Sequence, residues 1–284
     1  MNKCLVNMKI DMDMRNMSKA TQEAYLRRVT IFLKEIKKDI NDITIEDIKE
    51  YILCLKNVKN LCFGTINAYI SAIKFFYTIT LEQEWNEKRV PRMRGYKPLP
   101  EVMSKEEVFE IFDSINNLKH RAIVALMYGS GLRVSEVVKL KVTDIDSRNF
   151  QVRILQSKNK WDRYTILPNY TLELLRKYWK NCGKPRNWLF PGANPEEHYH
   201  VKSVKNLIIN LKEKLKLKKR ISSHTFRHCF ATHLLEDNIQ LVNIQHLMGH
   251  RNIRTTTRYL HMTSKTMMNI KSPIESYKKE NNHG

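Results

Sequence analysis

Four polar residues near the C-terminus have the types and spacing needed to handle a phosphodiester. His224 and Arg227 are three residues apart, so on a helix they share one face. His250 follows a glycine that can end a helix predicted over 241–248 and turn the imidazole back. Tyr259 lies nine residues further on, in a polar stretch with no core pattern that explains its ring. Cation, imidazole and phenol together predict phosphodiester cleavage through a covalent tyrosine.

A second polar element lies far upstream, after an apolar helix that ends at Tyr128. Two glycines make a turn there, and Arg133 and Glu136 share a face of the helix that follows. Three valines are expected to pack this helix against the core: Val134, Val137 and Val138. Arg133 and Glu136 would then remain available for polar contacts. Taken alone, Arg133 and Glu136 are as consistent with a structural ion pair as with a site. A lone His-x-x-Arg is likewise typical of a helix surface.

In combination, these elements resemble the tyrosine recombinase (phage integrase) family, especially its Xer-type and integron-type bacterial members. The resemblance runs from about Ser18 to Ser276. It rests on Gly-Leu-Arg-Val-Ser-Glu at 131–136, His-Thr-Phe-Arg-His at 224–228, Leu-Met-Gly-His at 247–250, and the segment from Thr256 to Tyr259. It implies a catalytic set in this chain order: Arg133, Lys158, His224, Arg227, His250 and Tyr259.

The resemblance also implies a role for each residue. Tyr259 attacks in line and leaves a 3′-phosphotyrosine and a free 5′-hydroxyl. Arg133 and Arg227 clamp the non-bridging oxygens with planar, permanently charged forks. One of the two histidines, His224 or His250, takes the tyrosine proton, and both donate to phosphoryl oxygens. Glu136 is expected to orient the arginine and histidine side chains. Because the covalent link stores the bond energy, rejoining needs no ATP.

A lysine in a predicted hairpin completes the set. Residues 150–154 and 163–167 alternate in the manner of strands around a polar turn that contains Lys158. In the family, a lysine in this turn enters the active site, where it is a candidate to protonate the departing 5′ oxygen. A serine and an asparagine flank Lys158 where family members often have glycines, so Lys160 remains the alternative.

A zinc site is the competing interpretation, because five histidines gather near the C-terminus. His224 and His228 stand at i and i+4 but bracket no glutamate, and Arg227 between them would oppose a cation. We therefore predict no metal and no cofactor. His228, His233 and His246 are expected to pack or hydrogen-bond.

The charge balance predicts a polyanionic partner. Lysine and arginine number 50 against 29 aspartates and glutamates, a formal net charge of +21. Residues 1–98 hold 18 basic and 12 acidic side chains, and residues 99–284 hold 32 and 17. Both halves therefore carry the excess, which suits double-stranded DNA better than a neutral metabolite.

Membrane binding is the competing use of positive charge. No apolar run approaches transmembrane length, and no long helix confines its basic residues to one polar face. Asp11 and Asp13 interrupt the N-terminal apolar residues, so we expect no secretory signal. The five cysteines lack Cys-x-x-Cys spacing and predict reduced thiols. We expect a cytoplasmic protein without a membrane partner.

The periodicity predicts a mainly α protein with a small β-sheet (α+β). Three helical patterns fill the first third, over 19–37, from Thr44, and over 65–79. A capping box at Ser104 opens the second domain. The expected organisation is an N-terminal extension (1–17), a helical SAM-like core-binding domain (18–88), a basic linker (89–100) and a catalytic domain with a C-terminal tail (101–284).

Basic residues on the first helices, in the linker and in the run 212–220 are expected to face DNA phosphates. Each alone would be ordinary solvated surface. They are Arg27, Arg28, Lys74, Arg92, Arg94, Lys216, Lys218, Lys219 and Arg220.

The tail after Tyr259 carries apolar residues too few to fold alone. In relatives such a tail docks on a neighbouring protomer, which implies a homotetramer on paired, inverted half-sites. A type IB topoisomerase-like enzyme and a non-catalytic DNA-binding protein are the alternatives, and the intact catalytic set argues against the second. Chromosome-dimer resolution, cassette exchange, element integration and transposition share this chemistry, so the residues leave the biological role open.

Overall fold

A computed structural model describes residues 3–95, 101–155, 162–250, 252–257 and 259–260. The chain divides into two compact units, Met1–Pro98 and Leu99–Gly284. The expected fold class, mainly helical with a small sheet, is confirmed. No helix within the described ranges is both long enough and apolar enough to cross a membrane.

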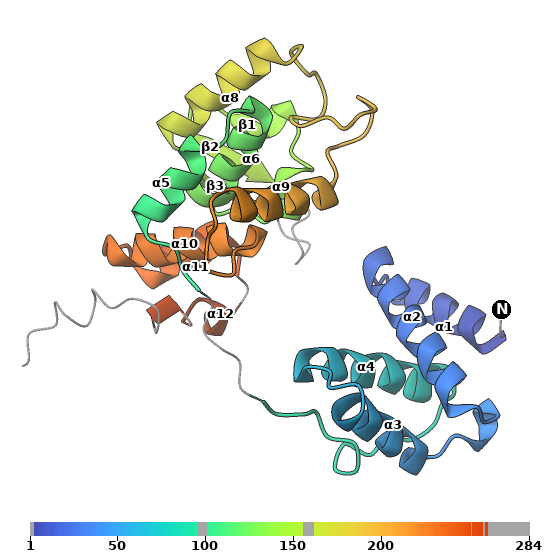
Figure 1. The fold of residues 1–284 in the computed structure, drawn as a ribbon. Helices are drawn as coiled ribbons and strands as arrows, with labels where there is room; N and C mark the ends of the chain where they lie inside the picture. The colour runs from blue at the N-terminus through green and yellow to red at the C-terminus, as the bar shows by residue number, and fades with distance from the viewer. Residues whose placement is uncertain (1–2, 96–100, 156–161, 251, 258, 261–284) are drawn as a thin grey trace, which may run out of the picture. The chain divides into compact units, whose positions relative to one another are not determined.

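Over residues 3–95, every regular element of the first unit is a helix (Figure 1). They are α1 (Lys3–Met14), α2 (Lys19–Ile36), the 3-10 turn η1 (Ile40–Asp42), α3 (Ile45–Asn57), α4 (Phe63–Phe75) and the π-turn η2 (Phe76–Thr80). Side-chain hydrogen bonds cap the first turns of two of these helices. Ser18 accepts a hydrogen bond from the Thr21 backbone N–H at α2, and Thr44 forms a reciprocal capping box with Asp47 at α3.

Helix α1 belongs to the packed body of this unit. The sequence predicts an extension over 1–17, but Met8 and Met12 are fully buried against Val29 and Phe76. These methionines are four residues apart and so lie on one helix face. Their unbranched side chains are well suited to filling irregular gaps between helices, which is why α1 docks although its pattern is weak.

The predicted linker also begins inside the first unit. Val90 is 4% exposed and joins the core that α3 and α4 share. The Asn67 side chain holds the Met93 backbone through two hydrogen bonds of 2.9 Å, one to its carbonyl and one from its N–H. Residues 89–95 therefore pack on α4, and residues 96–100 of the expected linker lie outside the described ranges.

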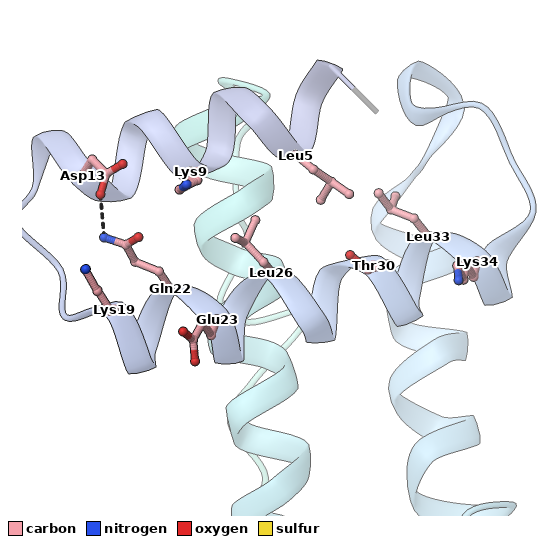
Figure 2. Close-up of a pocket in the computed structure, with 10 residues that line it drawn as sticks. All are labelled: Leu5, Lys9, Asp13, Lys19, Gln22, Glu23, Leu26, Thr30, Leu33 and Lys34. Atoms are coloured by element: carbon pink, nitrogen blue, oxygen red, sulfur yellow. Dashed lines mark hydrogen bonds between the residues drawn. The ribbon is translucent and has the colours of Figure 1, made fainter. Parts of the chain in front are cut away.

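A pocket of about 1070 Å³ lies between α1 and α2 (Figure 2). Leu5, Leu26 and Leu33 form its apolar wall. At one end the Gln22 amide donates a hydrogen bond of 2.8 Å to Asp13. The pocket contains none of the residues predicted to act on a phosphodiester, all of which belong to the second unit.

The second unit adds a sheet to a helical body (Figure 1). Its helices are α5 (Lys105–Asp113), α6 (Leu118–Gly129), α7 (Val134–Val137), α8 (Asn169–Asn181), α9 (Val201–Lys214), α10 (Ser223–Glu236), α11 (Leu241–Met248) and α12 (Arg254–Thr257), with a 3-10 turn η3 (Val142–Asp144). The strands are β1 (Ile145–Asp146), β2 (Gln151–Ile154) and β3 (Arg163–Ile166). Helix α6 is its centre: six consecutive residues, 122–127, are buried, and α8 and α10 pack on it.

The three strands form one antiparallel sheet in the order β1-β2-β3, so the predicted hairpin is confirmed. Val152 pairs with Thr165, and Ile154 pairs with Arg163. Since side chains two apart on a strand share a face, Thr165 and Arg163 point the same way. Thr165 donates a 2.9 Å hydrogen bond to the Ser130 carbonyl. This contact fixes β3 against the turn that precedes α7.

Candidate active site

Three guanidinium groups converge on one carboxylate, that of Glu136. Arg133 Nη1 lies 2.7 Å from Glu136 Oε1, and the Arg133 backbone N–H donates to Oε2. Arg163 donates twice, at 3.0 and 2.8 Å. Arg227 Nη1 lies 3.8 Å from Oε2. The side chains of Glu136, Arg163 and Arg227 are less than a tenth exposed, so these charges interact through protein rather than water.

The turn before α7 positions two members of this cluster. Arg133 occupies the position before the helix, and Glu136 completes a capping arrangement with it. The valines behind them, Val134, Val137 and Val138, are buried as predicted. Gly131 has φ +63, and a Cβ there would lie 2.4 Å from the Phe230 ring. Only glycine fits that close approach to α10.

Arg163 is a functional candidate that the sequence analysis missed. It stands at the start of β3, opposite the buried Ile154, and its Nε donates 3.2 Å to the Leu247 carbonyl at the end of α11. Strand alternation supplied the available signal: an arginine in phase with the buried Thr165 needs an internal partner. The sequence does not reveal that this partner is Glu136, 27 residues earlier.

Arg227 connects three segments that are distant in the sequence. It is 3% exposed, and its guanidinium donates to the Gly131 carbonyl, the Met248 carbonyl and the His250 ring. The turn before α7, helix α10 and the end of α11 therefore meet at one planar group. A lysine has a single ammonium in place of this fork and could not make the same set of bonds.

The cluster carries more positive than negative charge. Burial alone would raise the pKa of Glu136, but the hydrogen bonds and charge of Arg163, with the charge of Arg227, outweigh it and hold the pKa at about 2. Burial, together with the neighbouring charges of Arg133 and Arg163, lowers the pKa of Arg227 to about 9. Arg227 thus stays charged at neutral pH, and an added anion would relieve the repulsion among the arginines.

His250 is held by both ring nitrogens. Its Nδ1 lies 2.9 Å from the Thr256 hydroxyl, and its Nε2 lies 3.3 Å from Arg227 Nη2. Because an arginine only donates, Nε2 is the acceptor and Nδ1 carries the proton. Gly249 permits this arrangement: it has φ +61, and a Cβ there would lie 2.6 Å from Arg163 Cδ. The predicted glycine end of α11 is confirmed.

Tyr259 lies beside this group, but its surroundings differ from the prediction. Its ring is 2% exposed and packs with apolar residues of α10 and α11: Phe230, Ala231, Leu235, Ile244 and Met248. The expectation that no core explains the ring is wrong, because those partners come from helices distant in the sequence. The ring also stacks on His250, with centroids 6.5 Å apart and planes within 10°. Its hydroxyl lies 3.0 Å from Nδ1 of His228.

Of the remaining predicted catalytic residues, the structure describes His224 but neither of the two candidate lysines. His224 lies in the first turn of α10, and its ring is 6.5 Å from that of His228, one turn along the same helix. Lys158 and Lys160 lie outside the described residues, between two strands that are described. His233 is structural: Tyr128 and the Met103 carbonyl each lie 2.9 Å from one of its ring nitrogens.

The residues expected to face DNA divide into two groups. Several already have partners inside their own unit: Arg28 lies over the Tyr69 ring, Lys74 pairs with Glu87, Arg92 donates to Ser71, and Lys219 pairs with Glu107. The exposed group contains Arg27, Arg94, Lys216, Lys218 and Arg220. The surface ion pairs of Lys74 and Lys219 are weak, so these two lysines remain able to exchange a carboxylate for a phosphate.

Family models match nearly all of the described chain. Residues 5–87 match the N-terminal SAM-like domain of phage integrases. Residues 101–266 match the phage integrase family and include the arginine cluster, His250 and Tyr259. This chain belongs to the phage integrase family. The first match starts within α1, in agreement with the packing of that helix in the first unit.

Relatives of this recombinase have corresponding names. It is 38% identical to a putative integrase/recombinase, y4qK, of Sinorhizobium fredii, over 93% of this chain and 86% of the relative. It is 30% identical to a tyrosine recombinase of Thermosipho africanus, over 87% and 90% of the two chains. The prediction of a tyrosine-type site-specific recombinase is confirmed, and these matches favour neither the topoisomerase-like nor the non-catalytic alternative.

Solved recombinases share the fold. The XerH recombinase bound to a palindromic difH substrate gives a TM-score of 0.73 at 19% identity, covering 91% of this chain and 81% of that one. The XerA recombinase gives 0.55 at 24% identity, covering 98% of both.

Proposed function

We propose that this recombinase cleaves and rejoins double-stranded DNA through a 3′-phosphotyrosine on Tyr259. The observation that carries the proposal is the excess positive charge around Glu136, where three guanidiniums oppose one carboxylate. A phosphodiester under attack gains negative charge on its non-bridging oxygens, and fixed cations stabilise that charge most when water is excluded. The phenol of Tyr259 lies next to this cluster, because His250 contacts both its ring and Arg227.

Each residue of the proposed site has a separate role. Arg133 and Arg227 bind the non-bridging oxygens, and His224 adds a donor to the same oxygens. His250, whose Nε2 accepts from Arg227, positions that guanidinium instead of donating to the phosphate as the sequence suggested. Tyr259 attacks phosphorus, and the 5′ oxygen leaves. Lys158 protonates that oxygen, with Lys160 as the alternative donor two residues away. Glu136 positions the two arginines.

Arg163 also acts through Glu136. It supplies two of the hydrogen bonds that keep this carboxylate ionised and oriented. It further ties the carboxylate to the end of α11, where Gly249 and His250 follow. We therefore place Arg163 among the positioning residues rather than among those that touch the phosphate.

The DNA partner is proposed to be a duplex with inverted half-sites, bound by a homotetramer. The net charge of +21 supports strong phosphate contacts whose affinity falls steeply with salt. A related solved complex contains a palindromic substrate, XerH on difH, and another contains a circular transposon intermediate, the Tn1549 integrase. The apolar tail beyond Tyr259 is proposed to dock on a neighbouring protomer in the cytoplasm.

A nicked suicide substrate tests the proposal. After cleavage, the short fragment that carries the free 5′-hydroxyl diffuses away. Rejoining then cannot occur, so the covalent complex accumulates. Candidate DNA comes from inverted repeats with a short spacer in the sequence that flanks the gene. We expect a protein–DNA adduct attached through the DNA 3′ phosphate, with the 5′ end left as a free hydroxyl. An adduct through the 5′ phosphate, or hydrolysis without an adduct, would exclude this chemistry.

A further inference from the structure

The hydroxyl of Tyr259 has a basic partner that the proposed catalytic set does not include. It lies 3.0 Å from Nδ1 of His228, with the two ring centroids 5.7 Å apart. His228 directly follows Arg227 on α10 and is half-buried. Activated nucleophiles in enzymes characteristically have a base within hydrogen-bond distance of the attacking atom. This contact has that geometry.

The other histidine next to Tyr259 is engaged elsewhere. The His250 ring lies nearly parallel to the Tyr259 ring, with centroids 6.5 Å apart, while its two nitrogens contact Thr256 and Arg227. A proton leaving the phenol therefore has no lone pair on His250 in its path. His228, by contrast, directs a ring nitrogen at the hydroxyl oxygen.

Burial makes an internal acceptor necessary. A tyrosine phenol ordinarily has a pKa of about 10, so at neutral pH it must lose its proton during attack. The Tyr259 ring is 2% exposed and is surrounded by apolar residues of α10 and α11, which keeps bulk water from accepting that proton. A neutral imidazole is the most common group for this task near pH 7.

The charge of Arg227 stabilises the phenolate that this transfer creates. Arg227 precedes His228 in the sequence and is attracted to the negative charge that Tyr259 acquires on ionisation. As the phenol loses its proton, the resulting oxyanion is thus stabilised by the same guanidinium that is proposed to bind the phosphate.

We propose that His228 is the general base of strand cleavage. As the Tyr259 oxygen forms its bond to phosphorus, the phenolic proton passes to Nδ1 of His228. The bond from phosphorus to the 5′ oxygen breaks, and that oxygen takes its proton from the acid proposed above. In rejoining, a 5′-hydroxyl attacks phosphorus and gives its proton back to that acid, the tyrosine oxygen leaves, and His228 returns the phenolic proton to it. This inference rests on Tyr259 being the nucleophile.

An asparagine at this position separates hydrogen bonding from proton transfer. His228→Asn retains a polar group near the position of Nδ1 but cannot accept a proton. We expect cleavage of the suicide substrate to slow about 100-fold, the lower range for loss of a general base, with unchanged DNA affinity and melting temperature. His246→Asn, on the exposed face of α11, is the matched control and should cleave at the wild-type rate. His228→Gln replaces the asparagine variant if that one fails to fold.

A more acidic nucleophile supplies the second readout. Incorporating 2,3-difluorotyrosine at position 259 reduces the need for a base, so it should restore much of the rate lost in His228→Asn while changing wild type little. A His228 variant that cleaves at or above the wild-type rate would overturn the inference and make the contact a restraint on Tyr259. A slow variant that fluorination does not rescue would also overturn it. If Tyr259→Phe still forms the adduct, the proposed function itself fails, independently of His228.

Discussion

Replacing Glu136 with glutamine tests whether this carboxylate stabilises the arginine cluster. The pKa of Glu136 falls from an ordinary 4.5 to about 2 in the folded protein. At roughly 1.4 kcal/mol per pKa unit, this depression corresponds to about 3 kcal/mol of folding free energy at neutral pH. Removing one partner of a buried ion pair costs about 3–5 kcal/mol by comparison. The two magnitudes agree, so we expect Glu136→Gln to destabilise the second unit by about 3 kcal/mol.

The sign of the pH dependence follows from the same depression. A carboxyl whose pKa is lowered by folding stabilises the protein above its unfolded pKa, and the stabilisation is lost as pH falls through the folded value. The difference in unfolding free energy between wild type and Glu136→Gln should therefore have its full value at pH 7 and should decrease as pH falls from about 4.5 to 2.

Urea denaturation in a phosphate-free buffer measures the effect, because a bound anion would replace the missing charge. For a unit of this size, about 3 kcal/mol corresponds to a fall in melting temperature of roughly 6–12 °C. Glu110→Gln, an exposed change on α5, is the control and should shift stability by less than about 0.5 kcal/mol. A loss below about 1 kcal/mol, or a gap that stays constant from pH 7 to pH 3, would refute the proposed electrostatics.

Three further predictions concern the proposed machinery. Arg227→Lys should reduce cleavage by orders of magnitude with little change in DNA affinity, because one ammonium cannot replace a fork that also binds two carbonyls; near-normal single-turnover cleavage would contradict this. Cleavage by Lys158→Ala should be rescued by a 5′-bridging phosphorothioate, whose sulfur leaves without an acid. Rescue of Lys160→Ala alone would show that Lys160, and not Lys158, protonates the leaving oxygen. Truncation after Thr263 should keep DNA binding but abolish synapsis and recombination, and full-sized complexes in analytical ultracentrifugation would refute a tail-mediated assembly.

Local rules predicted the elements that carry the site. The capping boxes at Thr44 and Ser104 form as the sequence indicates, since each depends on residues three apart. The glycine at 249 ends α11 in the left-handed conformation, and the hairpin pairs in an antiparallel register. These features are decided within a few residues, which is why sequence alone suffices.

Contacts between distant segments were beyond the same rules. Arg163 and Glu136 meet only because β3 packs against the turn before α7. Tyr259 is buried because α10 and α11 supply its neighbours, although its own stretch is polar. Likewise, His228 looked like a packing residue, since the sequence does not show that its ring faces Tyr259. Partner choice of this kind depends on tertiary packing.

The most direct test of the central claim is the identity of the residue that becomes linked to DNA. Wild-type protein and Tyr259→Phe are each incubated with the nicked suicide substrate, and the adduct is digested and sequenced by mass spectrometry. We predict that wild type carries the nucleotide on the peptide containing Tyr259, and that Tyr259→Phe binds the same DNA with unchanged affinity but forms no adduct. An adduct on Tyr277, the one tyrosine that follows Tyr259 in the sequence, or on any other residue would contradict the assignment of the nucleophile, as would wild-type adduct yield from Tyr259→Phe.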